Sequence, residues 1–215
     1  MTISRFKDRN DAGKRLAQAL DEYSGNKNTI VIALPRGGVV LGSEVAKALH
    51  LPLDIISPRK IGAPFNPELA IGAISETGEG IFSDQLIEEF QISPEYIKRA
   101  VEKEKKEAQR RLSYYRGELP PRDLKGKTVL LIDDGVATGS TMFAAIKTSK
   151  AEQAGKIVVG VPVAPRDTFA RLQKEVDSAI SLSTPSPFFA VGQFYEEFDQ
   201  TTDEEVISLL KDHQE

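Results

Sequence analysis

Apolar and polar residues alternate along the chain with two different periods. Over residues 9–23, 39–49 and 94–116 the apolar positions recur every three or four residues, which is the spacing of an amphipathic α-helix. Between the helices lie short runs of apolar residues, many of them β-branched, which predict strands. These runs are Thr29–Leu34, Leu53–Ser57, Leu69–Ile74, Thr128–Asp133 and Lys156–Val161. Strands that alternate with helices in this way predict an α/β fold with a parallel twisted sheet flanked by helices.

Two segments interrupt this alternation. The stretch from Gly62 to Pro67 is rich in glycine and proline, so we expect a mobile loop there. The helix expected over Pro94–Arg116 has a narrow apolar stripe and many charges, including acid–base pairs four residues apart such as Glu107 and Arg111. This pattern is typical of a solvated helix with one packed face. The same helix is a candidate for a homodimer contact.

The composition changes this picture little but excludes several classes of function. The 215 residues suit a single domain over 1–215, and 40% hydrophobic with 28% charged residues is ordinary globular usage. There is no cysteine, so a disulfide, a thiolate nucleophile and a Cys-ligated zinc are excluded. The net charge of -4 gives no field that would attract nucleic acid or an anionic membrane, and no apolar run reaches the ~18 residues of a membrane span. Because no apolar leader follows Met1, we expect a cytoplasmic protein.

The segment Val129–Thr141 combines several features of a ligand site. An apolar strand ends in two adjacent carboxylates, Asp133 and Asp134, at the edge of the sheet where open α/β folds bind ligands. Small and hydroxylated residues at 137–141 then open a helix, so consecutive backbone N–H groups can hold a phosphate. Two acids beside a phosphate cradle suit a sugar diol, or a metal ion that bridges to further phosphate. A plain helix cap is the alternative, but the hydroxyl-rich continuation favours the phosphate site.

Three other phosphate-site motifs do not fit the spacing of the residues. A Walker A loop ending in Gly126-Lys127-Thr128 would need a glycine where Pro121 stands. An aspartyl phosphatase of the haloacid dehalogenase type has its two acids two residues apart, whereas Asp133 and Asp134 are adjacent. The glycines at 37, 38 and 42 do not form the G-x-G-x-x-G pattern of a dinucleotide loop, so no nicotinamide site is predicted.

The residues Val129–Thr141 resemble the 5-phosphoribosyl-1-pyrophosphate (PRPP) motif of type I phosphoribosyltransferases: an apolar strand, two acids and a Thr-Gly-x-Thr phosphate loop. Two shorter elements agree with that motif and occur in the family's order. Pro35-Arg36-Gly37-Gly38 resembles the pyrophosphate loop of the family, and Arg59-Lys60 resembles the start of its flexible catalytic loop. The resemblance covers a core of about residues 28–165.

The resemblance implies transfer of a phosphoribosyl group from PRPP to a nitrogenous base, with Mg²⁺, as in nucleotide salvage. Asp133 and Asp134 would hold the ribose hydroxyls, stabilise developing positive charge and contribute to Mg²⁺ binding, mostly through PRPP and water. Lys60 would close over the pyrophosphate as a catalytic residue. The alternative is a regulator on the same fold that senses PRPP or a nucleotide without turnover. The residues implied in PRPP binding are Arg36, Gly37, Gly38, Arg59, Lys60, Asp133, Asp134, Ala137, Thr138, Gly139, Ser140 and Thr141.

Three features bear on the acceptor base. Ala137 stands where many 6-oxopurine enzymes of the family have a third aspartate, and adenine phosphoribosyltransferases also have alanine there. Glu76 resembles an acid that the adenine enzymes place near the base, which makes it a candidate acid–base catalyst; a solvated turn residue is the competing interpretation. Phe188 and Phe189 lie in an aromatic segment over about 184–200, a candidate hood that stacks on the base, with core packing as the alternative. That segment resembles the C-terminal signature of a bacterial branch of predicted phosphoribosyltransferases, which does not identify the acceptor.

Overall fold

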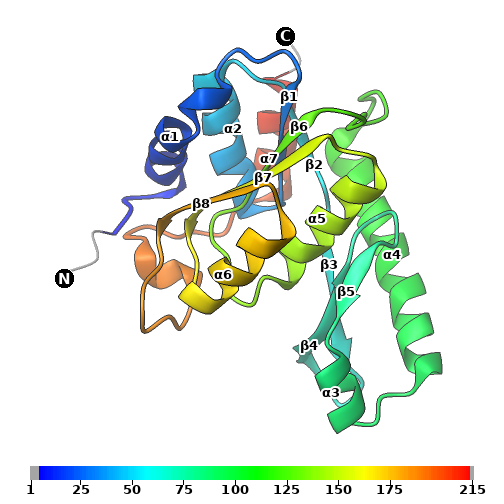
Figure 1. Cartoon of the computed structure of the whole chain (residues 1–215). Helices are drawn as coiled ribbons and strands as arrows, with labels where there is room; N and C mark the ends of the chain where they lie inside the picture. The colour runs from blue at the N-terminus through cyan, green and yellow to red at the C-terminus, as the bar shows by residue number, and fades with distance from the viewer. Residues whose placement is uncertain (1–4, 214–215) are drawn as a thin grey trace.

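Parallel strands form the central sheet of the computed structural model, which describes residues 5–213 apart from the side chain of Glu68 (Figure 1). Its strands are β1 (Thr29–Ala33), β2 (Leu53–Ile55), β6 (Thr128–Ile132), β7 (Lys156–Val163) and β8 (Ser178–Ser183). They are ordered β2-β1-β6-β7-β8, and every neighbouring pair is parallel. The parallel α/β sheet predicted from the sequence is confirmed. The edge strand β8 was not predicted, because its sequence of small polar residues lacks an apolar run.

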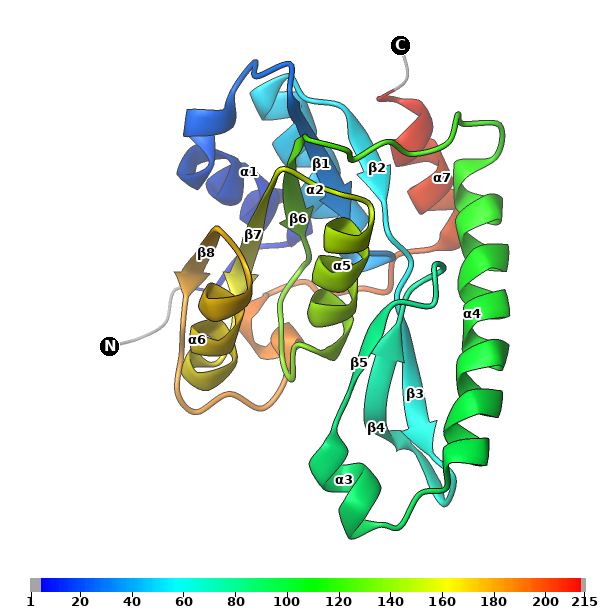
Figure 2. The same cartoon turned by 45° about the vertical axis from the view of Figure 1, so that its right-hand side comes forward.

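Helices cover both faces of this sheet, because the side chains of each strand alternate between the faces. In β1, Val31 and Ala33 join the core on one face, whereas Ile30 and Ile32 join the core on the other. The first face is covered by α1 (Arg9–Ala19), α2 (Gly37–Leu49) and α7 (Asp203–Lys211), and the second by α5 (Ser140–Ala151) and α6 (Arg166–Glu175) (Figures 1 and 2). Strands buried on both faces need apolar residues at every position, which explains the uninterrupted apolar runs.

A second, antiparallel sheet projects from the central one. It consists of β3 (Arg59–Ala63), β4 (Asn66–Ile74) and β5 (Gly80–Phe82), with α3 (Asp84–Glu89) at its far end (Figure 2). It lies between α5 and the long helix α4 (Pro94–Arg116). The strand predicted at Leu69–Ile74 is confirmed as part of β4, but it is antiparallel and does not belong to the central sheet. The mobile loop expected at Gly62–Pro67 is wrong, because most of this stretch belongs to β3 and β4. Ile61, Ile71 and Ile74 are buried against the apolar stripe of α4, and this burial outweighs the local glycines and prolines.

The N-terminal segment and the segment around Tyr195 meet beside the carboxyl end of β6. Phe6 forms an isolated parallel bridge with Tyr195, which follows the short 3₁₀ helix η2 (Val191–Phe194). The Phe6 amide donates to the Phe194 carbonyl at 2.8 Å, and the Glu196 amide donates to the Phe6 carbonyl at 2.8 Å. A further 3₁₀ helix, η1 (Asp21–Tyr23), links α1 to β1. Within residues 5–213, no helix is long and apolar enough to cross a membrane.

Candidate active site

The acidic pair and the glycine loop, far apart in the sequence, lie against each other. Their strands β6 and β1 are neighbours, with Ala33 opposite Ile132, and the order of strands along the chain reverses at this point. Open α/β sheets bind ligands at such a switch point. A Cβ atom added to Gly38 would lie 2.9 Å from Asp133 Oδ1, and one added to Gly37 would lie 2.0 Å from Asp134 Oδ2. Only glycine permits this approach, so the two predicted motifs form one site.

Burial and mutual repulsion make it unfavourable for Asp133 and Asp134 to be ionised at the same time. Burial, and after it the charge of Asp134, raises the pKa of the Asp133 carboxyl well above its ordinary value, although Arg9 and Lys60 oppose this shift. Burial also raises the pKa of Asp134, against the charge and hydrogen bond of Arg9. A cation placed beside the pair would stabilise both carboxylates in their ionised form.

Arg9 and Tyr195 hold Asp134 from the two terminal segments. Arg9 Nε donates to Asp134 Oδ2 at 2.8 Å, and their side chains are only 13% and 16% exposed. The Tyr195 hydroxyl donates to the Asp134 backbone carbonyl at 2.6 Å. The sequence analysis missed both residues. Arg9 lies in no recognisable motif, and Tyr195 lies in the aromatic segment 184–200, for which only a base hood or core packing was expected. The pairing of the N-terminal segment with the segment around Tyr195 brings both residues to β6.

The phosphate loop opens α5 as the sequence predicted. Gly139 has a φ of 84°, a left-handed conformation, and a Cβ there would lie 2.7 Å from the ring of Phe143. The hydroxyl of Thr168, on α6, donates to the Ala137 carbonyl at 2.9 Å and supports the turn from outside. The Thr138 and Ser140 hydroxyls lie 3.2 Å apart at the start of the helix, with half-buried Thr141 next to them. The helix N-terminus is therefore available to an anion.

Lys60 and the phosphate loop line one cavity of about 450 Å³, together with Arg171 of α6. Arg59 does not reach it, because neighbouring residues of a strand point to opposite faces. The Nε of the Arg59 guanidinium lies 3.0 Å from Oε2 of Glu104, on α4. The structure thus brings Lys60, but not Arg59, to the site. The sequence analysis also missed Arg171, a basic residue on the helix that follows β7.

Arg36, the arginine of the glycine loop, is half-buried immediately before α2. Its Nη1 lies 3.4 Å from Oδ1 of Asp203, the first residue of α7. The buried Tyr115 of α4 donates its hydroxyl to the same oxygen at 2.7 Å. Arg36 is therefore positioned by the C-terminal helix, a contact that the local sequence around Arg36 does not indicate.

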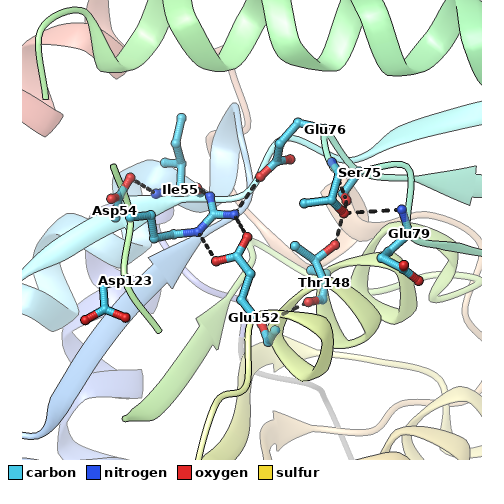
Figure 3. Close-up of polar contacts among 12 residues, drawn as sticks. Asp54, Ile55, Ser75, Glu76, Glu79, Asp123, Thr148 and Glu152 are labelled. Atoms are coloured by element: carbon cyan, nitrogen blue, oxygen red, sulfur yellow. Dashed lines mark hydrogen bonds and ion pairs between the residues drawn. The ribbon is translucent and has the colours of Figure 1, made fainter. Parts of the chain in front are cut away.

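Glu76 lies in a buried network rather than beside the acidic pair (Figure 3). It is 6% exposed, so the interpretation as a solvated turn residue is wrong. Its carboxylate accepts from Arg122 at 2.8 Å and from the Ser57 amide at 3.2 Å, and Glu152 pairs with the same arginine. Burial opposes the charge of Arg122, but Glu152 and Glu76 outweigh burial and raise its pKa. These contacts favour a structural role for Glu76 over the expected acid–base role, because they fasten the β4–β5 turn to the end of β2.

The two adjacent phenylalanines of the C-terminal segment have different environments. The half-buried Phe188 packs against Phe194 with ring centroids 5.1 Å apart, and it contacts the core under α1 and α2. Phe189 is 83% exposed. The segment also contacts the acidic loop, since a Cβ at Gly135 would lie 2.5 Å from Val191. Of the two rings, Phe189 is the one available to a ligand.

The carboxylates of Asp133 and Asp134 are the oxygen ligands that a magnesium ion would find here. Among residues 5–213, no cluster of three or more acidic or histidine side chains could hold a metal ion by itself. Mg²⁺ usually keeps several waters and takes one or two carboxylates together with substrate phosphates. The residues present therefore fit a magnesium ion that is held mostly by a bound diphosphate.

Comparisons with known proteins show which family the chain resembles as a whole. Residues 2–197 match the family model described as "Phosphoribosyl transferase domain". The "Putative phosphoribosyl transferase" of Mycobacterium tuberculosis, in strains CDC 1551 and H37Rv, is 43% identical over 205 residues, which are 95% of this chain and 46% of each relative. The chain thus spans about half the length of these relatives. The crystal structure of TT1426 from Thermus thermophilus superposes with a TM-score of 0.81 at 39% identity, covering 97% of this chain and 98% of that one.

Proposed function

Because the chain belongs to the phosphoribosyl transferase domain family, we propose that it transfers the phosphoribosyl group of PRPP to a nitrogenous base, with Mg²⁺, as in nucleotide salvage. The products would be a nucleoside 5-monophosphate and pyrophosphate. The observation that carries the proposal is the contact of Gly37 and Gly38 with the carboxylates of Asp134 and Asp133. This contact places the implied pyrophosphate loop beside the implied ribose site. The reaction requires that arrangement, because the bond that breaks joins the pyrophosphate to the anomeric carbon of the ribose.

Each part of the site has a distinct task in this reaction. The amides of residues 137–141 would bind the 5-phosphate at the N-terminus of α5. A carboxylate of the acidic pair would hold the ribose hydroxyls and face the anomeric carbon as it becomes cationic. Arg36 and the amides of Gly37 and Gly38 would bind the pyrophosphate, and Lys60 would approach it from β3.

The reaction requires no covalent bond between the protein and the substrate. The base nitrogen bonds to the anomeric carbon, the bond from that carbon to the pyrophosphate oxygen breaks, and the proton of the base passes to solvent. Bound Mg²⁺ would neutralise charge on the leaving pyrophosphate. The chain's own residues therefore act by positioning and by electrostatic stabilisation.

A panel of bases with PRPP and Mg²⁺, read by pyrophosphate release, tests the proposal. We expect one class of base to give turnover, and the double variant Asp133→Asn with Asp134→Asn to abolish it. Calorimetry on the same samples measures PRPP binding. Tight PRPP binding with no turnover on any base would instead indicate the sensing regulator, and no binding at all would contradict both functions.

A further inference from the structure

We propose that Arg171, on α6, binds the 5-phosphate of PRPP as a charged partner of the backbone amides in the phosphate loop. This inference rests on the proposed function. It adds to the phosphate site a residue that lies outside the loop and that no motif in the sequence indicated. Because the loop amides carry no net charge, Arg171 is the group that would favour a fully ionised phosphate monoester at this position.

Helix α6 lies beside α5 and contacts the phosphate loop (Figure 2). The Thr168 hydroxyl donates to the Ala137 carbonyl at 2.9 Å, and a Cβ atom added to Gly139 would lie 3.1 Å from Cγ2 of Thr168. Residues three positions apart are neighbours on one face of a helix. Arg171 therefore follows Thr168 along the face of α6 that contacts the loop.

The ring of Phe143, on α5, holds the guanidinium of Arg171 close to the loop. A Cβ atom added to Gly139 would lie 2.7 Å from this ring, so the ring packs against the backbone of the loop. The guanidinium carbon of Arg171 lies 4.9 Å from the centroid of the same ring. A cation–π contact of this kind orients the guanidinium and leaves its N–H groups to donate at the edges.

The charge of Arg171 is available to a ligand. The side chain lines the cavity of about 450 Å³ that Thr138 and Ser140 of the phosphate loop also line. Within residues 5–213 no acid forms an ion pair with Arg171. Glu175, four positions along the helix, could reach it but pairs instead with Lys150 at 3.1 Å. An anion in the cavity would therefore compete with no carboxylate for this guanidinium.

The cavity has a second cation, Lys60, which lies at a different place. The charge of Lys60 opposes the rise in the pKa of the Asp133 carboxyl, which places Lys60 beside the acidic pair. Arg171 contacts the ring that packs on Gly139, which places Arg171 beside the phosphate loop. PRPP carries anionic groups at both ends of its ribose. The two cations would therefore serve opposite ends of the substrate, with Lys60 at the pyrophosphate and Arg171 at the 5-phosphate.

The test compares the wild type with Arg171→Met by calorimetry in Mg²⁺, for PRPP directly and for ribose 5-phosphate by displacement of PRPP. Methionine keeps an apolar chain beside Phe143 and removes the charge. Because the two ligands share the ribose and its 5-phosphate, we expect Arg171→Met to weaken the affinity for both by the same factor. That factor should be roughly 10-fold, as for one charge-assisted hydrogen bond from an exposed side chain. Lys174→Met is the matched control, since Lys174 is an exposed cation one turn further along α6, and it should change neither affinity by more than about 2-fold.

Thermal melts of each variant separate folding from binding, and Arg171→Gln supplies the same comparison if Arg171→Met does not fold. A loss of affinity for PRPP alone would show that Arg171 meets the pyrophosphate. Unchanged affinities for both ligands would show that it only packs on Phe143, and an equal loss in Lys174→Met would show a general effect of charge. Each of these results, or a wild type that binds PRPP but not ribose 5-phosphate, would overturn the inference and leave the proposed function intact. A wild type that binds neither ligand would overturn both.

Discussion

Asp203, the first residue of α7, forms an ion pair with Arg36, with 3.4 Å between Oδ1 and Nη1. Burial and the Asp203 carboxylate raise the pKa of Tyr115 to about 12, so its hydroxyl stays protonated and keeps donating to that carboxylate. The carboxylate is thus held in place beside the arginine that we assign to pyrophosphate. Asp203 both positions Arg36 and competes for its charge.

Replacing Asp203 by asparagine should tighten PRPP binding. The amide keeps a hydrogen-bond acceptor near Arg36 and Tyr115 but removes the competing charge. Because a half-exposed ion pair contributes at most about 1 kcal/mol, the expected gain is no more than roughly 5-fold in affinity by calorimetry. Glu204→Gln, an exposed neighbour on the same helix, is the control. Weaker binding in Asp203→Asn would show that positioning outweighs competition.

We expect substitution of Lys60 to affect catalysis and substitution of Arg59 to affect stability. Lys60 lines the cavity of the phosphate loop, whereas Arg59 pairs with Glu104 on the opposite face of β3. Lys60→Ala should lower kcat more than it weakens PRPP binding, since it acts on the leaving group. Arg59→Ala should leave kcat nearly unchanged and cost at most about 1 kcal/mol of stability. Steady-state rates with urea unfolding decide this, and a larger kcat loss in Arg59→Ala would reverse the assignment.

We expect substitution of Phe188 to affect stability and substitution of Phe189 to affect binding of the base. Phe188→Ala removes a partly buried ring, so we expect a loss of stability below the ~3–5 kcal/mol of a full core position. Phe189→Ala should not change the melting temperature, because the ring is 83% exposed. If Phe189 stacks on the base, its loss should raise KM for the base by the factor that corresponds to about 1–3 kcal/mol of lost binding free energy. An unchanged KM would place the base elsewhere.

The raised pKa of Asp133 predicts a pH-dependent stability. Between the ordinary pKa of an aspartate and the raised one, the folded state binds more protons than the unfolded state, so stability falls as pH rises. In EDTA and without PRPP, Asp133→Asn should therefore melt a few degrees above the wild type near neutral pH. The difference should vanish below about pH 4, where both states are protonated. Asp123→Asn, with 70% of its side chain exposed, should show no such difference.

Glu76→Gln tests whether this residue is structural or catalytic. Loss of the charge leaves Arg122 with Glu152 alone, so we expect a stability loss of about 1–3 kcal/mol in chemical unfolding. PRPP affinity and kcat below the unfolding transition should change little. Glu79→Gln, on the same turn, should be neutral in both assays. Normal stability with lost turnover would restore the acid–base role expected from the sequence.

The sequence predicted the elements whose signals are local. The helix Pro94–Arg116 has the expected bounds because Ser93 caps its first turn, Pro94 occupies the first helical position and Gly117 follows its end. The sequence likewise predicted the strand β6 and the phosphate loop, because an apolar run, two acids and a series of small residues follow one another there. By contrast, β3 resembled a loop, because its pairing with β4 and its burial on α4 depend on residues outside the glycine- and proline-rich stretch.

The parts of the site that the sequence did not show are contacts between distant residues. Arg9 and Asp134 are separated by 125 positions, and Arg36 and Asp203 by 167. No spacing rule connects such pairs, because their meeting depends on how the terminal segments pack on the finished sheet. The glycines could have given a hint, since Gly37 and Gly38 are required by the carboxylates that approach them.

The bridge between Phe6 and Tyr195 has a consequence for a chain still on the ribosome. The strand that bears Asp133 and Asp134 is synthesised well before Tyr195, which follows Asp134 by 61 positions. At ~5–20 residues per second, that stretch takes roughly 3–12 s to synthesise. During the interval a nascent chain can contain the central strands, while the Arg9 guanidinium still lacks the Phe198 ring that it contacts and the Asp134 carbonyl lacks Tyr195. The contacts that hold Arg9 and the Asp134 carbonyl can therefore form only after these aromatic residues have been added to the chain.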